Sequence, residues 1–230
     1  MLVAMLMEAG CRIAALDVPA SLSAIADDWP DAITRIPLDA TKENEVEGAF
    51  ARVAEDGALD GLVNLAGFTR ERCSVAKTQH AAWQEVIDVN LDSAFLCARA
   101  AMPLLRDGRD AAMVLTSSGL ALKPTPGYGP YAAAKAGVLA LTRILAAENA
   151  PHVRVNAVAP SAVETTFLTG GTGRARRKSS FDKDAYLATV PLARMAKPID
   201  VVEPVLFLLG PASSYITGQT LHVNGGLIMP

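Results

Sequence analysis

Short apolar segments alternate with long helical segments throughout the chain of 230 residues. The short segments lack the polar–apolar alternation of a half-exposed strand, which favours parallel strands covered on both faces. The order of segments predicts an α/β fold with a doubly wound, Rossmann-like, mostly parallel sheet and helices on both faces. The predicted strands are residues 12–16, 32–37, 61–64, 112–116, 153–157 and 220–223, and the predicted helices are 42–55, 80–105, 130–150 and 199–209.

The composition is that of an ordinary globular protein, with 51% hydrophobic and 20% charged residues. We therefore expect residues 1–230 to form a single domain with a sizeable core. The net charge of -3 and the aromatic content of 5% argue against a nucleic-acid surface. No apolar run approaches the length of a membrane span.

The three cysteines, Cys11, Cys73 and Cys97, are odd in number and widely spaced. This spacing fits neither a disulfide framework nor a zinc site. With only three histidines in addition, we predict no metal centre. A reducing cytoplasm is the expected location.

Tyr131 and Lys135 lie four residues apart in a predicted helix and therefore share one of its faces. A free phenol titrates near pH ~10, and a nearby ammonium would lower that pKa enough for proton exchange near neutral pH. Ser118, thirteen residues before Tyr131, could hydrogen-bond the same substrate oxygen. Taken alone, a Tyr-Lys pair of this spacing is more often an exposed helix pair without a function.

Other motifs accompany this set in a fixed order along nearly the whole chain. They are Asn64-Leu65-Ala66-Gly67, Asn90, Asn156–Ser161, Thr217–Gln219 and Val223–Gly226. Together with Ser118, Tyr131 and Lys135, this ordered set resembles the classical short-chain dehydrogenase/reductase (SDR) family.

The resemblance implies an oxidoreductase that transfers a hydride between a nicotinamide cofactor and a carbonyl or secondary alcohol. Tyr131 would be the general acid or base, and Ser118 would hold and polarise the substrate oxygen. Lys135 would lower the tyrosine pKa and hydrogen-bond the nicotinamide ribose, and Asn90 would position a water that relays protons to the lysine. As alternatives without a catalytic role, Asn90 could mark a kink within a helix, and Ser118 could simply end a strand.

Asp17 comes directly after the predicted strand 12–16, where an acid would accept hydrogen bonds from the adenosine ribose and repel a 2′-phosphate. No basic residue follows in Val18-Pro19, so NAD is predicted over NADP, with a surface turn as the alternative.

The resemblance implies further cofactor contacts. It places Asp39 at the adenine, and Thr165 and Asn156 at the nicotinamide end. Asn64 and Gly67 lie in the turn that, in the family, follows the fourth strand. Ser161 stands where the family has a glycine after Pro160.

Residues 168–183 interrupt the alternation of predicted strands and helices. Three of the four residues from Gly170 to Gly173 are glycines, and four basic residues follow: Arg174, Arg176, Arg177 and Lys178. We expect a mobile substrate loop around residues 165–190. The basic cluster is either solvated surface or an anion-binding lid.

The family's initial strand and its Thr-Gly-x-x-x-Gly-x-Gly turn have no counterpart in these residues. That turn brings backbone amides to the pyrophosphate at a helix N-terminus. Met1–Glu8 resembles the second half of the helix that follows the turn. Either the protein starts upstream, or it is a shortened member with impaired cofactor binding. In this form we expect weak dinucleotide binding, and a gap or rearrangement between the strands ending at Asp17 and Asn64.

Two functions remain in competition: an NAD(P)-dependent oxidoreductase, and a non-catalytic SDR-like oligomer partner with impaired cofactor binding. For the enzyme, 3-oxoacyl thioesters, sugars and hydroxysteroids are candidate substrates, and the thioester is preferred. Helices 80–105 and 130–150 are apolar over more than one face, which predicts a homodimer or homotetramer through these two helices.

Overall fold

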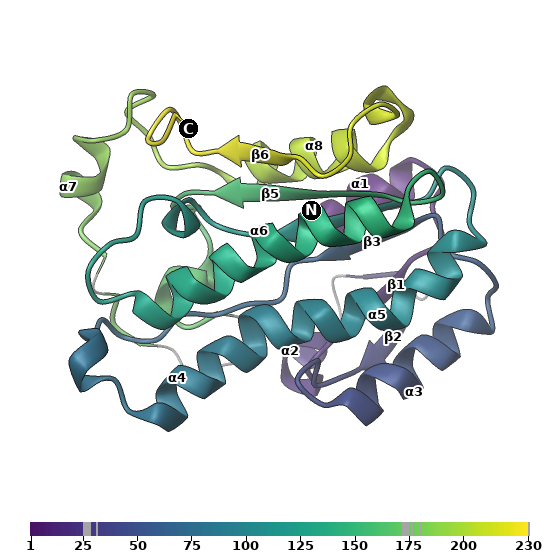
Figure 1. The fold of residues 1–230 in the computed structure, drawn as a ribbon, viewed down its shortest axis with the longest axis horizontal. Coiled ribbons are helices and arrows are strands. Elements are labelled where there is room, and N and C mark those ends of the chain that lie inside the picture. Colours follow the sequence, from purple (N-terminus) through teal and green to yellow (C-terminus); the bar gives the residue numbers. More distant parts are fainter. Residues whose placement is uncertain (25–28, 31, 172–174, 176, 180, 230) are drawn as a thin grey trace.

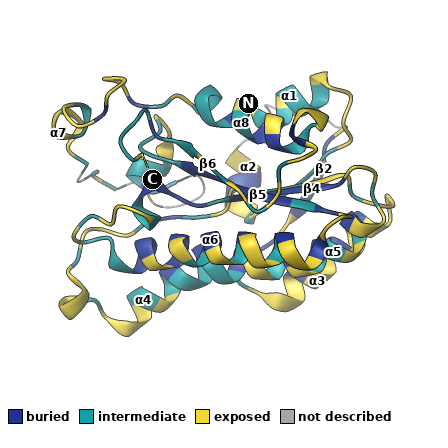
Figure 2. Cartoon of the chain, turned by 45° about the horizontal axis from the view of Figure 1, so that its top comes forward, coloured by how far each residue is buried: buried dark blue, intermediate teal, exposed yellow. Residues whose placement is uncertain are grey.

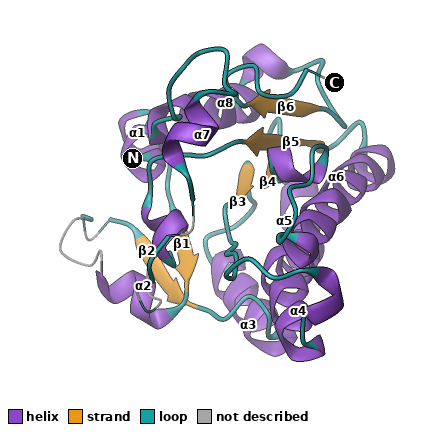
Figure 3. Ribbon diagram, turned by 90° about the vertical axis from the view of Figure 1, so that its left-hand side faces the viewer, coloured by secondary structure: helices purple, strands orange, loops and turns teal. Residues whose placement is uncertain are grey.

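The computed structural model describes residues 1–24, 29–30, 32–171, 175, 177–179 and 181–229. The strands of this part of the chain form two parallel sheets, as Figures 1 and 3 show. β1 (Ala14–Asp17) pairs with β2 (Thr34–Pro37) in the smaller sheet. In the larger sheet, β3 (Gly61–Asn64), β4 (Ala112–Thr116), β5 (Arg154–Pro160) and β6 (Thr220–Val223) follow one another in that order. The predicted parallel α/β architecture is confirmed.

The expected discontinuity lies between β1 and β3, which do not pair in the described structure. The two sheets nevertheless share one hydrophobic core, because Ile36 of β2 and Leu38, just after it, belong to the same buried cluster as Met113 and Leu115 of β4. Packing through helices thus joins the two sheets without strand pairing.

The larger sheet is covered on both faces because neighbouring residues of a strand point to opposite sides. Met113 and Leu115 face the cluster formed with α3 (Glu43–Ala54), α5 (Ser93–Arg106) and α6 (Gly129–Asn149). Val114 and Val158 instead pack against α8 (Pro198–Leu209) and against Leu2 of α1 (Leu2–Glu8). The expected helix at Met1–Glu8 is therefore present and contributes to the second face.

The predicted helix 80–105 is divided by a π-helical turn. α4 (His80–Ile87) runs into this turn at Asp88–Asp92, and α5 follows it directly. Such single π-turns interrupt the regular hydrogen-bond ladder and are frequent at functional sites. Asn90 lies within the turn.

The remaining helices are short: α2 (Pro19–Ala24) and α7 (Lys183–Leu187). Single 3₁₀ turns occur at Val75–Lys77, Gly119–Ala121, Thr166–Thr169 and Pro211–Ser213. Among the described residues, no helix combines the length and the apolar character that crossing a membrane requires.

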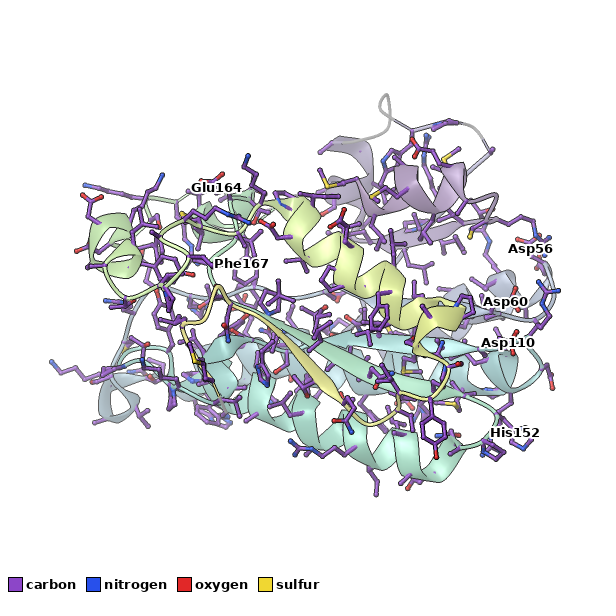
Figure 4. All side chains as sticks on the ribbon, turned by 90° about the horizontal axis from the view of Figure 1, so that it is seen from above. Asp56, Asp60, Asp110, His152, Glu164 and Phe167 are labelled. Carbon is purple, nitrogen blue, oxygen red and sulfur yellow. The ribbon has the colours of Figure 1, made fainter. Side chains whose placement is uncertain are left out.

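The two edges of the larger sheet differ in the side chains that they carry. Asp60, Asp110 and His152 precede β3, β4 and β5 and lie together at the edge where these strands begin. Glu164 and Phe167 lie at the opposite edge, where the strands end (Figure 4). Ser118 follows β4 and Ser161 follows β5, so the predicted site residues gather at this second edge.

Candidate active site

Two hydrogen bonds fasten the start of α6 to the end of β4. The Lys135 Nζ donates to the backbone oxygen of Thr116 at 2.8 Å, and the Ser117 hydroxyl donates to the backbone oxygen of Lys135 at 2.7 Å. Pro130 in the first turn of α6 has a backbone angle suited to helix initiation. Tyr131 and Lys135 are consequently both buried, with 8% and 2% of their surface exposed.

The hydroxyl of Ser118 lies next to the hydroxyl of Tyr131 and acts to lower the pKa of that phenol. Ser118 also caps the turn at Gly119–Ala121, where its Oγ accepts a hydrogen bond from the Leu120 amide at 3.2 Å. This cap fixes the Ser118 side chain. Two hydroxyl groups therefore converge at one point, as a reacting carbonyl oxygen requires of its donors.

Burial raises the pKa of Tyr131 to about 12, and the neighbouring Ser118 hydroxyl opposes this rise. The ring lies in an apolar cluster with Phe68 and Val86, and Phe167 packs against that cluster. The prediction of a lowered tyrosine pKa is thus wrong for this structure, because removal of the phenolate from water dominates. Tyr131 is held as the protonated acid.

Burial lowers the pKa of Lys135 to about 8. The Lys135 ammonium lies 5.8 Å from the centre of the Tyr131 ring and is held in place by its hydrogen bond to the backbone oxygen of Thr116. A lysine with this pKa exchanges its proton near neutral pH far more readily than a solvated lysine does.

Asn90 connects the π-turn to the segment after β3. Its Nδ2 donates to the backbone oxygens of Phe68 and Val86 at 2.9 and 2.8 Å, and its Oδ1 accepts from the Phe68 amide at 3.3 Å. The side chain is only 1% exposed. Its amide therefore positions Gly67 and Phe68 directly, and it does so from the turn that interrupts the helix.

Gly67 is a glycine because of this close approach. A Cβ at this position would lie 2.7 Å from Asn90 Oδ1 and 3.3 Å from Lys135 Nζ. The structure thus brings Gly67, Asn90 and Lys135 together. Asn64 shapes the same turn, since its Oδ1 accepts from the Ala66 amide at 3.0 Å.

Asp17 and Asp39 lie at the end of the smaller sheet, separate from the Tyr131 site. Asp17 is exposed, and its Oδ1 accepts from the Val18 amide at 2.7 Å. Asp39 organises a turn by accepting from the Thr41 amide and hydroxyl at 3.0 and 2.7 Å. Because Asp17 pairs in register with Pro37, both acids are at the same edge.

Thr165 lies beside the site, and Asn156 does not. Thr165 caps the turn at Thr166–Thr169, and Phe167 in that turn has its ring centre 6.1 Å from that of Tyr131. Asn156 is fully buried, with its amide bonded to the Ile216 oxygen and the Gln219 amide. The expected placement of Asn156 at the nicotinamide is therefore wrong, because both ends of its side chain are used to hold the segment before β6.

The basic cluster is described only in part. Thr172, Gly173, Arg174 and Arg176 lie outside the described residues. Arg177 donates a hydrogen bond to the backbone oxygen of Thr69, and Lys178 is exposed. Arg177 thus fastens the loop to the segment after β3, which supports a structural use of this cation.

Several residues that shape the site were not predicted from the sequence. The Thr116 oxygen and the Ser117 hydroxyl hold Lys135, and the rings of Phe68 and Phe167 enclose Tyr131. The serine pair Ser117-Ser118 was the available signal for the first group. No sequence spacing indicates the aromatic enclosure, since Phe68 and Phe167 are far apart in the chain. Within the described residues, no group of His, Cys, Asp or Glu side chains is arranged to hold a metal ion.

Comparison with known proteins identifies the family. The family model described as enoyl-(acyl carrier protein) reductase matches residues 2–228. The 3-oxoacyl-[acyl-carrier-protein] reductase FabG of Thermotoga maritima is 34% identical over 91% of this chain and 82% of its own length. The chain is a classical short-chain dehydrogenase/reductase.

Further SDR relatives agree in sequence and in structure. FabG of Staphylococcus aureus is 38% identical over 77% of this chain and 69% of its own length. The NADH complex of a 3-ketoacyl-(acyl-carrier-protein) reductase from Brucella melitensis superimposes with a TM-score of 0.89 at 27% identity, covering 99% of this chain and 92% of that one. The ligand-free aldohexose dehydrogenase of Thermoplasma acidophilum gives 0.82 at 25% identity, covering 98% and 88%. This SDR is an oxidoreductase that uses a nicotinamide cofactor.

The burial of Lys135 predicts a specific pH dependence of stability. Its pKa falls from 10.5 to about 8 on folding, so the unfolded chain binds more protons than the folded chain between these values. The charged Lys135 therefore lowers the free energy of unfolding by about 3 kcal/mol at neutral pH. This destabilisation diminishes as the pH rises from about 8 toward 10.5.

Lys135→Met is the variant that isolates this effect. Urea unfolding of both proteins at about pH 7 and about pH 10 should show the wild type gaining stability relative to the variant by ~2–3 kcal/mol. A difference that stays constant between these pH values would show that the ammonium is not desolvated on folding.

Proposed function

We propose that this SDR reduces the ketone of a 3-oxoacyl thioester. The observation that carries the proposal is the pair of neighbouring Ser118 and Tyr131 hydroxyls beside the buried Lys135 at the end of β4. The named activities of the Thermotoga maritima and Staphylococcus aureus relatives support this substrate class over a non-catalytic role.

In this reaction the two hydroxyls donate hydrogen bonds to the ketone oxygen. Tyr131 has a pKa of about 12, so it is fully protonated at neutral pH and transfers its proton as negative charge develops on that oxygen. Ser118, held by its cap to Leu120, keeps its hydrogen bond throughout. Lys135, with a pKa of about 8, returns a proton to Tyr131, and Asn90 orders the backbone along which a water relay would run.

The residues around Lys135 fit the nicotinamide end of the cofactor. The Thr116 hydroxyl is buried at the end of β4 and has no hydrogen-bond partner within the described residues, so it is available to a ligand. Gly67 lets the backbone approach Asn90 and Lys135 more closely than a residue with a Cβ could. When bound, the nicotinamide supplies the hydride. Tyr131, Lys135, Gly67, Asn64 and Thr165 would hold this end.

A cavity next to Tyr131 offers space for an acyl group. It has a volume of about 160 Å³ and mostly apolar walls, which include Ala82 and Val86 of α4 and Pro130 of α6. Polar side chains such as those of Arg70, Glu71 and Gln79 also line the cavity. We assign this cavity to the acyl chain, and residues 165–190 to the substrate loop that adjoins it.

We propose NAD as the preferred cofactor because Asp17 presents an exposed carboxylate at the end of β1. Asp39 would contact the adenine from the same edge. The NADH complex of the Brucella melitensis relative supports this choice.

We further propose a homodimer or homotetramer that assembles through helices 80–105 and 130–150. α6 exposes an apolar stripe composed of Ala133, Ala136, Ala140, Ile144 and Ala147. Ile144 is 52% exposed and Phe95 of α5 is 45% exposed, and Figure 2 shows the outer surfaces of these helices among the exposed parts of the chain. Large apolar side chains exposed along one helix face are typical of an interface.

The free thiols support a cytoplasmic location. Cys11 is exposed, Cys73 half-buried and Cys97 buried, and none forms a disulfide. Such thiols are typical of a reducing compartment.

Tyr131→Phe removes the proton donor and keeps the ring in its apolar cluster. We expect turnover of a short 3-oxoacyl thioester to fall at least ~100-fold, the lower end of general acid catalysis, with folding intact. The assay follows absorbance of the reduced nicotinamide. Tyr215→Phe is the matched control, because Tyr215 is fully exposed and its hydroxyl should be dispensable. Near-normal turnover by Tyr131→Phe would contradict the mechanism.

Asp17→Ala should shift cofactor preference toward NADP. Removing the carboxylate abolishes its repulsion of the 2′-phosphate, so the Kd ratio of NADP to NAD should fall about tenfold, or ~1.4 kcal/mol. Titration calorimetry with both cofactors measures the ratio, and Asp107→Ala provides a control for loss of an exposed acid. Tighter NADP than NAD binding by the unmutated protein would refute the assignment.

Ile144→Arg should dissociate the assembly, because an interface would have to bury an unpaired guanidinium. Sedimentation velocity at micromolar concentration should show a dimer or larger species for the wild type and a smaller species for the variant. Leu192→Arg, at a position that is 64% exposed outside these helices, should sediment as the wild type does. A monomeric wild type would rule out this interface.

A further inference from the structure

One phenol joins the substrate loop to the end of β5. The hydroxyl of Tyr186, in α7, donates to the Ser161 Oγ at 2.6 Å. The hydroxyl oxygen of Tyr186 also accepts a hydrogen bond from the Ala162 amide at 3.3 Å. The Tyr186 side chain therefore contacts Ser161 and Ala162, the two residues that directly follow β5.

The segment that receives Tyr186 is held on both sides. The Ser161 amide donates to the Val223 oxygen at 3.1 Å, which extends the pairing of β5 with β6. On its other side, the Ala196 amide donates to the Ala162 oxygen at 3.1 Å, and the Glu164 amide to the Ala196 oxygen at 2.8 Å. Ser161 is thus part of the fixed framework.

α7 itself is too short to define its own position. It has 5 residues, and helices of this length are not stable alone in water. Asp182 caps it by accepting from the Ala185 amide at 3.0 Å, but this bond is internal to the loop. The contact of Tyr186 with Ser161 and Ala162 connects the helix to the framework.

Tyr186 in turn places an aromatic wall. The ring of Phe181 packs on that of Tyr186 with 5.2 Å between ring centres. Phe181 also lines a small cavity together with Thr69, Tyr128 and Arg177. Thr69 borders the larger cavity next to Tyr131 as well, so Phe181 stands at the approach to the proposed acyl site.

We propose that the Ser161–Tyr186 hydrogen bond is a latch that positions α7 and Phe181 over the entrance for the acyl substrate. Tyr186 and Ser161 are positioning residues for substrate binding and take no part in proton transfer. A glycine at position 161 would offer no hydroxyl, so the serine is the residue that makes the latch possible. The kinetic consequence rests on the proposed thioester reduction, whereas the structural consequence does not.

Hydrogen exchange tests the latch without any assay of activity. Tyr186→Phe keeps the ring that packs on Phe181 and removes the acceptor of the Ala162 amide. We expect that amide, and those of residues 182–188, to exchange at least about fivefold faster than in the wild type, as loss of one hydrogen bond implies. Ser161→Ala should speed amide exchange of residues 182–188 to a similar extent, and Ser161→Thr, which keeps a hydroxyl, should restore their protection from exchange. Tyr215→Phe should leave all of these rates unchanged.

Steady-state kinetics with a 3-oxoacyl thioester tests the positioning role. Tyr186→Phe and Ser161→Ala should each raise KM about fivefold with kcat within about twofold, and the double variant should be no worse than either single variant. Unchanged exchange of the Ala162 amide in folded Tyr186→Phe protein would overturn the latch. Additive effects on KM, or a change confined to kcat, would overturn its role in binding. If the wild type reduces no 3-oxoacyl thioester, the proposed function fails, and the exchange rates alone decide the latch.

Discussion

The site depends on the clamp between β4 and α6. Lys135 donates to the end of β4, and Ser117 donates back to Lys135, so strand and helix are fixed at the same point from both directions. This clamp buries Tyr131 one turn earlier in the helix and brings its hydroxyl to Ser118. The parallel sheet contributes by ending β3, β4 and β5 at one edge, so that the segments carrying Gly67, Ser118 and Ser161 leave the sheet on the same side although they are distant in sequence.

Burial acts in opposite directions on the two titrating groups of α6. It raises the pKa of Tyr131 to about 12 and lowers that of Lys135 to about 8, because each charged form loses its hydration. The phenol is thereby kept protonated for donation to a ketone, while the lysine becomes a proton carrier. Burial thus favours the protonated phenol, which is the form that donates a proton.

Sequence reasoning predicted what is encoded locally. Short apolar runs predicted the strands, and the spacing of Ser118, Tyr131 and Lys135 follows from a strand end and one helix turn. The pKa of Tyr131 was predicted in the wrong direction because its enclosure by Phe68, Val86 and Phe167 comes from segments far apart in the chain. Asn156 lies in a matching motif, yet its side chain points into the core, since hydrogen-bond partners are set by packing. No pattern in the sequence predicts the π-turn at Asn90 or the contact between Tyr186 and Ser161.

The state of the Tyr131 phenol is the quantity on which the account rests. Spectrophotometric titration of wild type against Tyr131→Phe isolates its ionisation, because phenolate formation changes the ultraviolet absorbance of that one residue. The account predicts that Tyr131 ionises well above the ordinary value of 10.0, near the value of about 12 that its burial implies. Ionisation of Tyr131 at or below a pH of about 8 in the free protein would contradict it, since the ammonium of Lys135 would then outweigh desolvation.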